Sequence, residues 1–272
     1  RSTLFPYTTL FRSALAVLTG NLVTTVATAG LLIPVGAAVA YFVVMFRSPK
    51  VTARERTHLR AYIPLWVGAV LFFMITEQAA GKMATFAESN TDLRLPFFGW
   101  STTAEAYQSV NPAVIVLLAP LVGMFFTRRA GRFPTTIMKF TIAVLIVGLS
   151  ALMLGYGFQI WPGGQDLSPW WFLVLVYVIQ TVAELFLTPV GLATATTLAP
   201  KSFASQAMGL WWLSVAAGQG VAGFIIAQTE DLSDATYYYG LGAATLLMAL
   251  VLFAVAPWTQ RQMADVETAA AE

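Results

Sequence analysis

Cysteine is absent from the 272 residues, and histidine occurs once, as His58. The first absence excludes disulfides and thiolate metal sites, and a single imidazole cannot form a histidine metal cluster. Charged residues make up only 10% of the chain, whereas soluble domains carry about 25%. The sequence also lacks a short glycine-rich phosphate loop and a His/Asp/Ser set for hydrolysis, so we do not expect an enzyme.

Hydrophobic residues account for 58% of the chain and run in long segments separated by short polar loops. Each segment is near or above the roughly 20 residues that a helix needs to cross a bilayer. We therefore predict an all-α, polytopic membrane protein whose main partner is the lipid bilayer. The expected spans are about 14–46, 61–86, 109–127, 140–160, 170–198, 208–228 and 237–257.

The loops between these spans alternate in charge. The loops "RSPKVTARERTHLR" and "RRAGRFPTTIMK" are basic, whereas "TEDLSD" is purely acidic, and the tail begins with Arg261. The positive-inside rule places the basic loops, and with them the C-terminus, in the cytoplasm. Because the net charge of +2 is spread over such loops, we do not expect nucleic acid as a partner.

Two carboxylates, Glu77 and Glu184, lie well inside predicted spans. A charge near the bilayer centre costs about 2.5–3.5 kcal/mol on insertion scales, so such residues usually serve a function. We favour an aqueous cavity in which they bind a cation or a proton. The alternative is a structural role, with Glu77 paired to Lys82, although five residues is a poor helical spacing for a pair.

Two prolines lie near polar residues in these spans. Pro189 and Gly191 follow Glu184, and a proline kink there would form a hinge beside the carboxylate. Asn111 precedes Pro112; its amide either points into the bundle or caps the start of a helix. Both interpretations of Asn111 stay open on spacing alone.

Two adjacent tryptophans, Trp211 and Trp212, stand in "MGLWWLSVAAGQGVAG". They are either an anchor at the membrane interface, which is the usual role, or one of them lines a pocket. Small residues in the same span predict close helix packing: Ala216, Ala217, Gly220 and Gly223.

Four strings occur in order, each on its own span: "FFMITEQAAGKMATFA", "QSVNPAVIVLLAP", "AELFLTPVGLATATTLAP" and "MGLWWLS". Together they resemble the proton-coupled oligopeptide transporter family of the major facilitator superfamily. The resemblance implies a C-terminal six-helix bundle of a twelve-helix fold in a bacterial inner membrane. It assigns 14–60 to an extra helix and a cytoplasmic loop, 61–258 to the bundle and 259–272 to a cytoplasmic tail.

The resemblance also implies a role for single residues. Glu77 matches the acidic position linked to proton coupling, and Glu184 matches the carboxylate that holds the amino terminus of the peptide. Asn111 and Trp211 match peptide contacts, and this shifts the interpretation of Trp211 towards a pocket. Phe73 is also expected at the substrate site, although many members carry tryptophan at its position. The expected substrates are small peptides, with protons as the coupling ion and no other cofactor.

The family's first-helix motif, whose arginine would pair with Glu77, is not found, and neither is the lysine that would face Glu184. We therefore expect that the N-terminal bundle of the same polypeptide is missing and that this chain alone does not transport. Residues 1–13 have no signal-peptide pattern, and Thr3 to Ser13 match a translated sequencing adapter, so we expect an artefact there. The alternatives are another major facilitator carrier, for drugs or small anions, and a membrane scaffold without transport.

Overall fold

The computed structural model describes residues 22–96, 100–128, 134–229 and 231–269. Its elements are α2 (Leu22–Arg47), α3 (Ala53–Thr76), η1 (Glu77–Ala80), α4 (Lys82–Ser89), η2 (Ala104–Ser109), α5 (Val110–Arg128), α6 (Thr136–Ile160), α7 (Trp170–Thr197), η3 (Lys201–Phe203), α8 (Ala204–Gln228) and α9 (Asp234–Ala269). Within these ranges, seven helical segments are long and apolar enough to cross a membrane. The predicted all-α fold with seven spans is confirmed. Residues 1–13, and the start of the first predicted span, lie outside the described residues.

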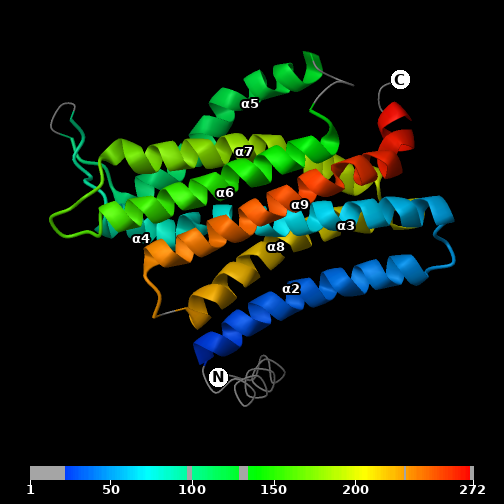
Figure 1. The fold of residues 1–272 in the computed structure, drawn as a ribbon, viewed down its shortest axis with the longest axis horizontal. Helices are drawn as coiled ribbons and strands as arrows, with labels where there is room; N and C mark the ends of the chain where they lie inside the picture. Colours follow the sequence, from blue (N-terminus) through cyan, green and yellow to red (C-terminus); the bar gives the residue numbers. More distant parts are fainter. Residues whose placement is uncertain (1–21, 97–99, 129–133, 230, 270–272) are drawn as a thin grey trace, which may run out of the picture.

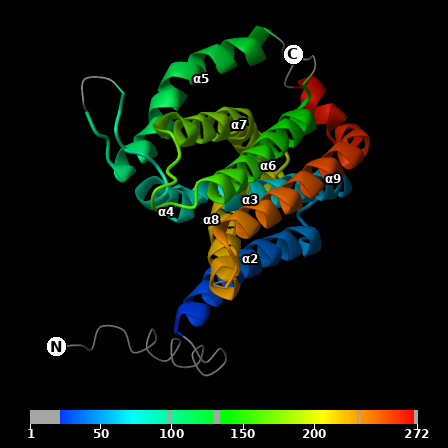
Figure 2. The same cartoon turned by 60° about the vertical axis from the view of Figure 1, so that its left-hand side comes forward.

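The helices form an elongated bundle with their long axes roughly aligned (Figure 1). α6 packs along α9 and α7, and α3 packs against α6, α8 and α9. α5 stands to one side and packs mainly on α7, and α2 lies on the outside of α8 (Figures 1 and 2). Exposed apolar side chains on these outlying helices, such as Val116 and Leu117 on α5, are expected where a helix faces lipid or another bundle.

The first helix of the bundle differs from its predicted form at both ends. We expected one span over 61–86, but α3 begins at Ala53 and is interrupted after Thr76. The early start follows from a capping box, because the Thr52 hydroxyl accepts from the Glu55 backbone and the Glu55 carboxylate accepts from the Thr52 N–H.

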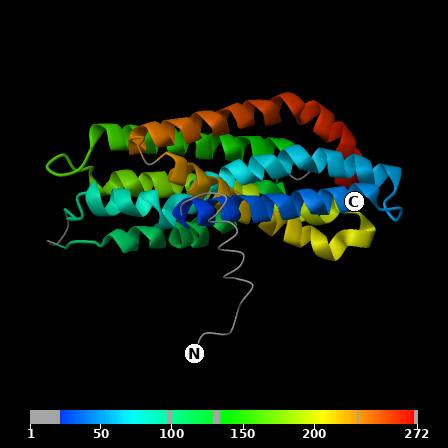
Figure 3. The same ribbon diagram turned by 90° about the horizontal axis from the view of Figure 1, so that it is seen from below.

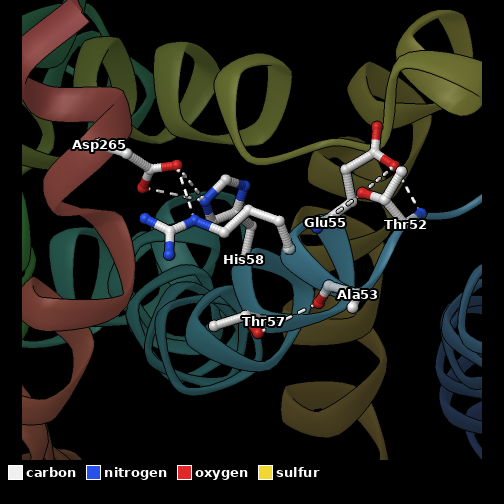
Figure 4. A network of polar contacts seen from close by, with 7 residues as sticks. Thr52, Ala53, Glu55, Thr57, His58 and Asp265 are labelled. Carbon is white, nitrogen blue, oxygen red and sulfur yellow. Dashed lines mark hydrogen bonds and ion pairs between the residues drawn. The ribbon is translucent and has the colours of Figure 1, made fainter.

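The last helix is longer than the apolar span that we predicted to end at 257. α9 continues through Pro257 to Ala269, so much of the tail that we assigned to 259–272 is helical. Asp265 on this extension accepts a hydrogen bond from Arg54 Nε at 2.9 Å and lies 3.1 Å from His58 Nε2. Figure 4 shows Asp265 facing His58 across the gap between the two helices. The C-terminal end of α9 therefore meets the start of α3, on the side of the bundle where residues 48–52 connect α2 to α3 (Figure 3).

Glycines let α8 approach two neighbours closely. A Cβ on Gly220 would lie 2.1 Å from the carbonyl oxygen of Gly30 on α2, and a Cβ on Gly218 would lie 2.8 Å from the backbone of α3. The predicted close packing is confirmed at Gly220. Gly223 has no atom within 4 Å of its Cβ position, so the stripe of small residues is only partly used.

Candidate substrate and proton site

The helix that carries Glu77 is broken at that residue. α3 ends at Thr76, a 3-10 turn spans Glu77–Ala80, and α4 resumes at Lys82. Such a break frees backbone carbonyls that need new partners in a membrane. The buried Gln78 supplies one, because its Nε2 donates to the Met74 carbonyl at 3.3 Å and to the Tyr237 hydroxyl at 2.8 Å. Discontinuous helices of this kind commonly form binding sites in transporters.

Glu77 is exposed at this break, on the inner side of the bundle. Its Oε2 accepts a hydrogen bond of 2.7 Å from Gln219 Nε2 on α8. Lys82 forms an ion pair with Asp234 at the start of α9, and its ammonium lies 4.9 Å from the centre of the Tyr237 ring. The alternative in which Lys82 pairs with Glu77 is therefore wrong, because the short helix α4 turns Lys82 towards α9.

Glu184 lies half-buried in the middle of α7. Its Oε2 accepts a hydrogen bond of 2.9 Å from Asn111 Nδ2, and the same nitrogen lies 3.1 Å from the Thr181 hydroxyl. Asn111 belongs to the first turn of α5, which begins at Val110. Its amide points across to α7, so the interpretation that placed it inside the bundle is confirmed.

One cavity of about 250 Å³ brings these residues together. Its wall is made by the broken helix α3–η1, by the junction of η2 with α5, and by α7. Four of the residues selected from the sequence line this cavity: Phe73, Glu77, Asn111 and Glu184. The full lining is Phe73, Thr76, Glu77, Ala79, Ala80, Gln108, Asn111, Tyr177, Gln180 and Glu184.

Trp211 lies behind this wall and not on it. Only 1% of the residue is exposed, and its ring packs edge-on against Phe73 with the ring centres 5.7 Å apart. The adjacent Trp212 is 58% exposed on the outer side of α8. The structure thus places Trp211 as the support of Phe73, one layer away from the cavity.

Gly191 gives Trp211 the room that it needs. A Cβ on Gly191 would lie 2.0 Å from the Trp211 ring, so no larger residue fits there without rearrangement. Pro189 lies inside the unbroken helix α7, where it cannot donate to the carbonyl of Leu185. Both residues therefore lie one to two turns from Glu184, and a hinge at this point stays a prediction.

Several polar residues of the site were not predicted. Gln180 lines the cavity, is buried, and its Nε2 has no hydrogen-bond partner among the described residues. Its position one helical turn before Glu184 was a usable signal, because residues four apart share a helix face. Gln78, Tyr177 and Gln219 depend on contacts between helices far apart in the chain, which one sequence does not reveal.

Among the residues that the structure describes, no group of three or more His, Asp or Glu side chains could hold a metal ion. The cavity instead presents two carboxylates on different helices, with amides and aromatic rings between them. Such a set of groups suits a small organic ligand that carries a positive charge.

The fold is a polytopic helical bundle with a cavity beside a broken helix, an arrangement that is common in membrane transporters. The model of the POT family matches residues 23–241, and the chain belongs to this family.

Similar proteins support this assignment. The uncharacterized transporter YclF of Bacillus subtilis (strain 168) is 34% identical over 238 residues, which cover 87% of this chain and 46% of the relative. A di-/tripeptide transporter of Lactococcus lactis subsp. lactis (strain IL1403) is 31% identical over 260 residues, covering 94% of this chain and 51% of the relative. The chain thus spans about half the length of these curated relatives.

Solved structures show the same relation. A crystal structure of the peptide transporter POT, in a variant form in complex with alafosfalin, matches with a TM-score of 0.82 and 34% identity. The match covers 94% of this chain and 52% of that one. A POT family transporter in complex with 5-aminolevulinic acid matches with a TM-score of 0.80 and 30% identity, covering 93% of this chain and 54% of that one.

Proposed function

We propose that this chain forms the C-terminal half of a proton-coupled di-/tripeptide symporter. The observation that carries the proposal is the pair of carboxylates in one cavity, Glu77 and Glu184. Neither is paired with a cationic side chain among the described residues. Two carboxylates without cations can take up a proton at one position and an ammonium group at the other.

Glu184 is the proposed partner of the peptide amino terminus. Asn111 on α5 donates from Nδ2 to Oε2 of Glu184 at 2.9 Å. This hydrogen bond orients the Glu184 carboxylate before a ligand binds. Phe73, supported by Trp211, supplies an apolar wall for a peptide side chain. Pro189 and Gly191 form the proposed hinge of α7 beside this site.

Glu77 is the proposed proton site. It lies at a helix break, is exposed to the cavity, and has a hydrogen-bonding partner in Gln219 that is neutral. A carboxyl in such a place can exchange a proton with water and respond to a charge placed nearby. Protons are then the coupling ion, and no other cofactor is proposed.

The cavity is about 250 Å³, below the ~300–1,000 Å³ of pockets for drug-sized ligands. We infer that an N-terminal bundle of the same polypeptide covers its open side and supplies the cationic partners of both carboxylates. The half-length match to the relatives supports this inference. Alternating access in such transporters needs two bundles that rock around a central site.

The proposed location is a bacterial inner membrane with the C-terminus in the cytoplasm. The contact of Asp265 with Arg54 supports this orientation, because it places the end of α9 beside the basic loop that precedes α3. Basic loops favour the cytoplasmic side.

Uptake by a joined transporter tests the proposal. The joined transporter is a fusion in which this chain follows the N-terminal half of the Lactococcus lactis di-/tripeptide transporter. The purified fusion is reconstituted into liposomes. We expect an inward proton gradient to drive uptake of a labelled dipeptide. Glu184→Gln should weaken competition by free dipeptides at least tenfold, because a hydrogen bond to a charged group contributes about 1.5–3 kcal/mol.

N-acetylated dipeptides provide the matched comparison, since they lack the ammonium group. They should compete poorly with the labelled dipeptide, both in the unsubstituted joined transporter and in Glu184→Gln. Equal affinity of Glu184→Gln and the unsubstituted protein for free dipeptides would refute the role of Glu184.

A further inference from the structure

Three consecutive residues of α8 face three different neighbours. A Cβ on Gly218 would lie 2.8 Å from the backbone nitrogen of Met74 on α3, and a Cβ on Gly220 would lie 2.1 Å from the Gly30 carbonyl on α2. Between them, Gln219 reaches Glu77. Successive residues on an α-helix point about 100° apart, so three consecutive residues can contact three different neighbours. Figures 1 and 2 show α8 lying between α3 and α2.

The two glycine contacts fix where the Gln219 side chain starts. At Gly218 the backbones of α8 and α3 touch within a turn of Glu77, and at Gly220 the backbones of α8 and α2 touch. A shift or rotation of α8 at this level therefore changes the reach from Gln219 to Glu77. The hydrogen bond of 2.7 Å leaves little slack for such a shift.

α2 also contacts α3, at a position nearer its C-terminal end than Gly30. Phe42 packs on Tyr62 and Trp66 of α3, with ring centres 6.2 and 6.1 Å apart. Trp66 in turn donates through Nε1 to the Leu210 carbonyl on α8, at 2.8 Å. α2 is thus tied to α3 near its C-terminal end and to α8 at Gly30, so it braces α8 against the bundle.

The amide of Gln219 suits a carboxyl that gains and loses a proton. In the structure its Nε2 donates to the Glu77 carboxylate. If the amide turns over, its Oε1 can accept from the protonated acid, so one side chain can serve both states. A lysine or arginine could not do so, because each is a donor only.

Other charged and titratable groups near Glu77 are engaged elsewhere. Lys82 pairs with Asp234 on α9, and the Tyr177 hydroxyl on α7 lies 3.5 Å from the Ala79 carbonyl. Glu184, across the cavity, accepts from Asn111. Within the described part of the chain, the interaction that reaches the Glu77 carboxylate from another helix comes from Gln219.

We propose that Gln219 is a positioning residue for proton coupling and that α2 sets its place through the contact of Gly220 with Gly30. This inference rests on the proposed proton site at Glu77. It gives the helix outside the six-helix bundle a role, namely to hold α8 so that the amide meets the carboxyl in both of its protonation states.

Infrared difference spectroscopy of the 272-residue chain in lipid nanodiscs tests the contact without transport. The carboxyl band of Glu77 is identified by its loss in Glu77→Gln. We expect Gln219→Leu to shift this band, because the amide partner is removed, and Gly220→Ala to shift it in the same direction. Gly223→Ala is the matched control on α8, since its new Cβ meets nothing within 4 Å.

Transport by the joined transporter tests the consequence. Gln219→Leu should lower proton-driven dipeptide uptake about tenfold, the effect of losing a hydrogen bond to a charged group. Counterflow exchange of dipeptides, which needs no net proton movement, should stay within about twofold. Gln228→Leu, an exposed amide at the end of the same helix, should change neither.

Phe42→Ala is a second test of α2, for use if Gly220→Ala fails to fold. It removes the ring that packs on α3 and adds no atoms. It should shift the carboxyl band of Glu77 and lower driven uptake, as Gln219→Leu does. An unchanged carboxyl band and unchanged driven uptake in Gln219→Leu would overturn the proposal, and so would an equal loss of driven uptake and counterflow. If the unsubstituted joined transporter moved no dipeptide in either assay, the proposed function would fail instead, while the infrared result would still decide whether Gln219 and α2 position Glu77.

Discussion

Asn111 Nδ2 donates to Glu184 Oε2 at 2.9 Å and so joins the first turn of α5 to the middle of α7. α5 is otherwise the most loosely attached helix, since none of its residues is buried within the described structure. The same hydrogen bond therefore orients the carboxylate and holds a wall of the cavity. The peptide binding proposed at Glu184 would therefore be coupled to the position of α5 through one amide.

Replacing that amide tests the coupling. Asn111→Ala should weaken dipeptide affinity of the joined transporter about three- to tenfold, because Glu184 loses a fixed donor. Hydrogen exchange in the first turns of α5 should also speed up. Thr127→Val is the control, because its hydroxyl bonds Gly123 at the other end of α5. Unchanged affinity and exchange in Asn111→Ala would show that the bond positions nothing.

Gly191 should tolerate no side chain while Trp211 is in place. Gly191→Ala would put its Cβ 2.0 Å from the Trp211 ring, and overpacking of this kind costs about 1–3 kcal/mol. Thermal unfolding followed by circular dichroism should show a clear loss for Gly191→Ala and little for Gly209→Ala, whose Cβ meets nothing within 4 Å. Adding Trp211→Leu should restore part of the loss, and strict additivity of the two substitutions would contradict the packing account.

Gln78 should stabilise the helix break. Gln78→Leu leaves the Met74 carbonyl and the Tyr237 hydroxyl without their amide partner, and a buried polar group left without a partner costs about 1–3 kcal/mol. Tyr237→Phe removes one of the same bonds, so the double variant should lose less than the sum of the single losses. Equal stability of Gln78→Leu and the unsubstituted chain in thermal unfolding would argue against this role.

The polar contacts at the far end of the bundle should matter much less. Asp265 is half-exposed where it meets Arg54 and His58 (Figure 4), and exposed ion pairs contribute about 0.2–1 kcal/mol. Asp265→Asn should therefore change the midpoint of thermal unfolding far less than Gly191→Ala does. Hydrogen exchange should nevertheless rise in the last turns of α9, and a large global loss of stability would contradict this ranking.

The sequence predicted the features that follow from composition and from local residue type. Long apolar segments require helices in a bilayer, so seven spans were foreseeable. Glu77 and Glu184 could be selected because a carboxylate inside a span has a cost that calls for an explanation. Asn111 followed from its place before Pro112, although only the structure decides between its two interpretations.

The break at Glu77 could not be predicted, because Glu, Gln and Ala are good helix formers. At the break Gln78 meets Tyr237, which lies 159 positions further along the chain. The support of Phe73 by Trp211 and the contact of Gln219 with Glu77 likewise join distant segments. Packing between helices decides these features, and hydrophobic patterning does not encode it.

The central claim is that Glu77 couples the proton and Glu184 binds the peptide. It is tested most directly by comparing Glu77→Gln with Glu184→Gln in the joined transporter, in proton-driven uptake and in counterflow. We predict that Glu77→Gln loses driven uptake and keeps counterflow, because the proton site is lost and the peptide site remains. Glu184→Gln should lose both, since the peptide ammonium has no anion to bind. Loss of both activities in Glu77→Gln, or full activity of Glu184→Gln in either assay, would contradict the account.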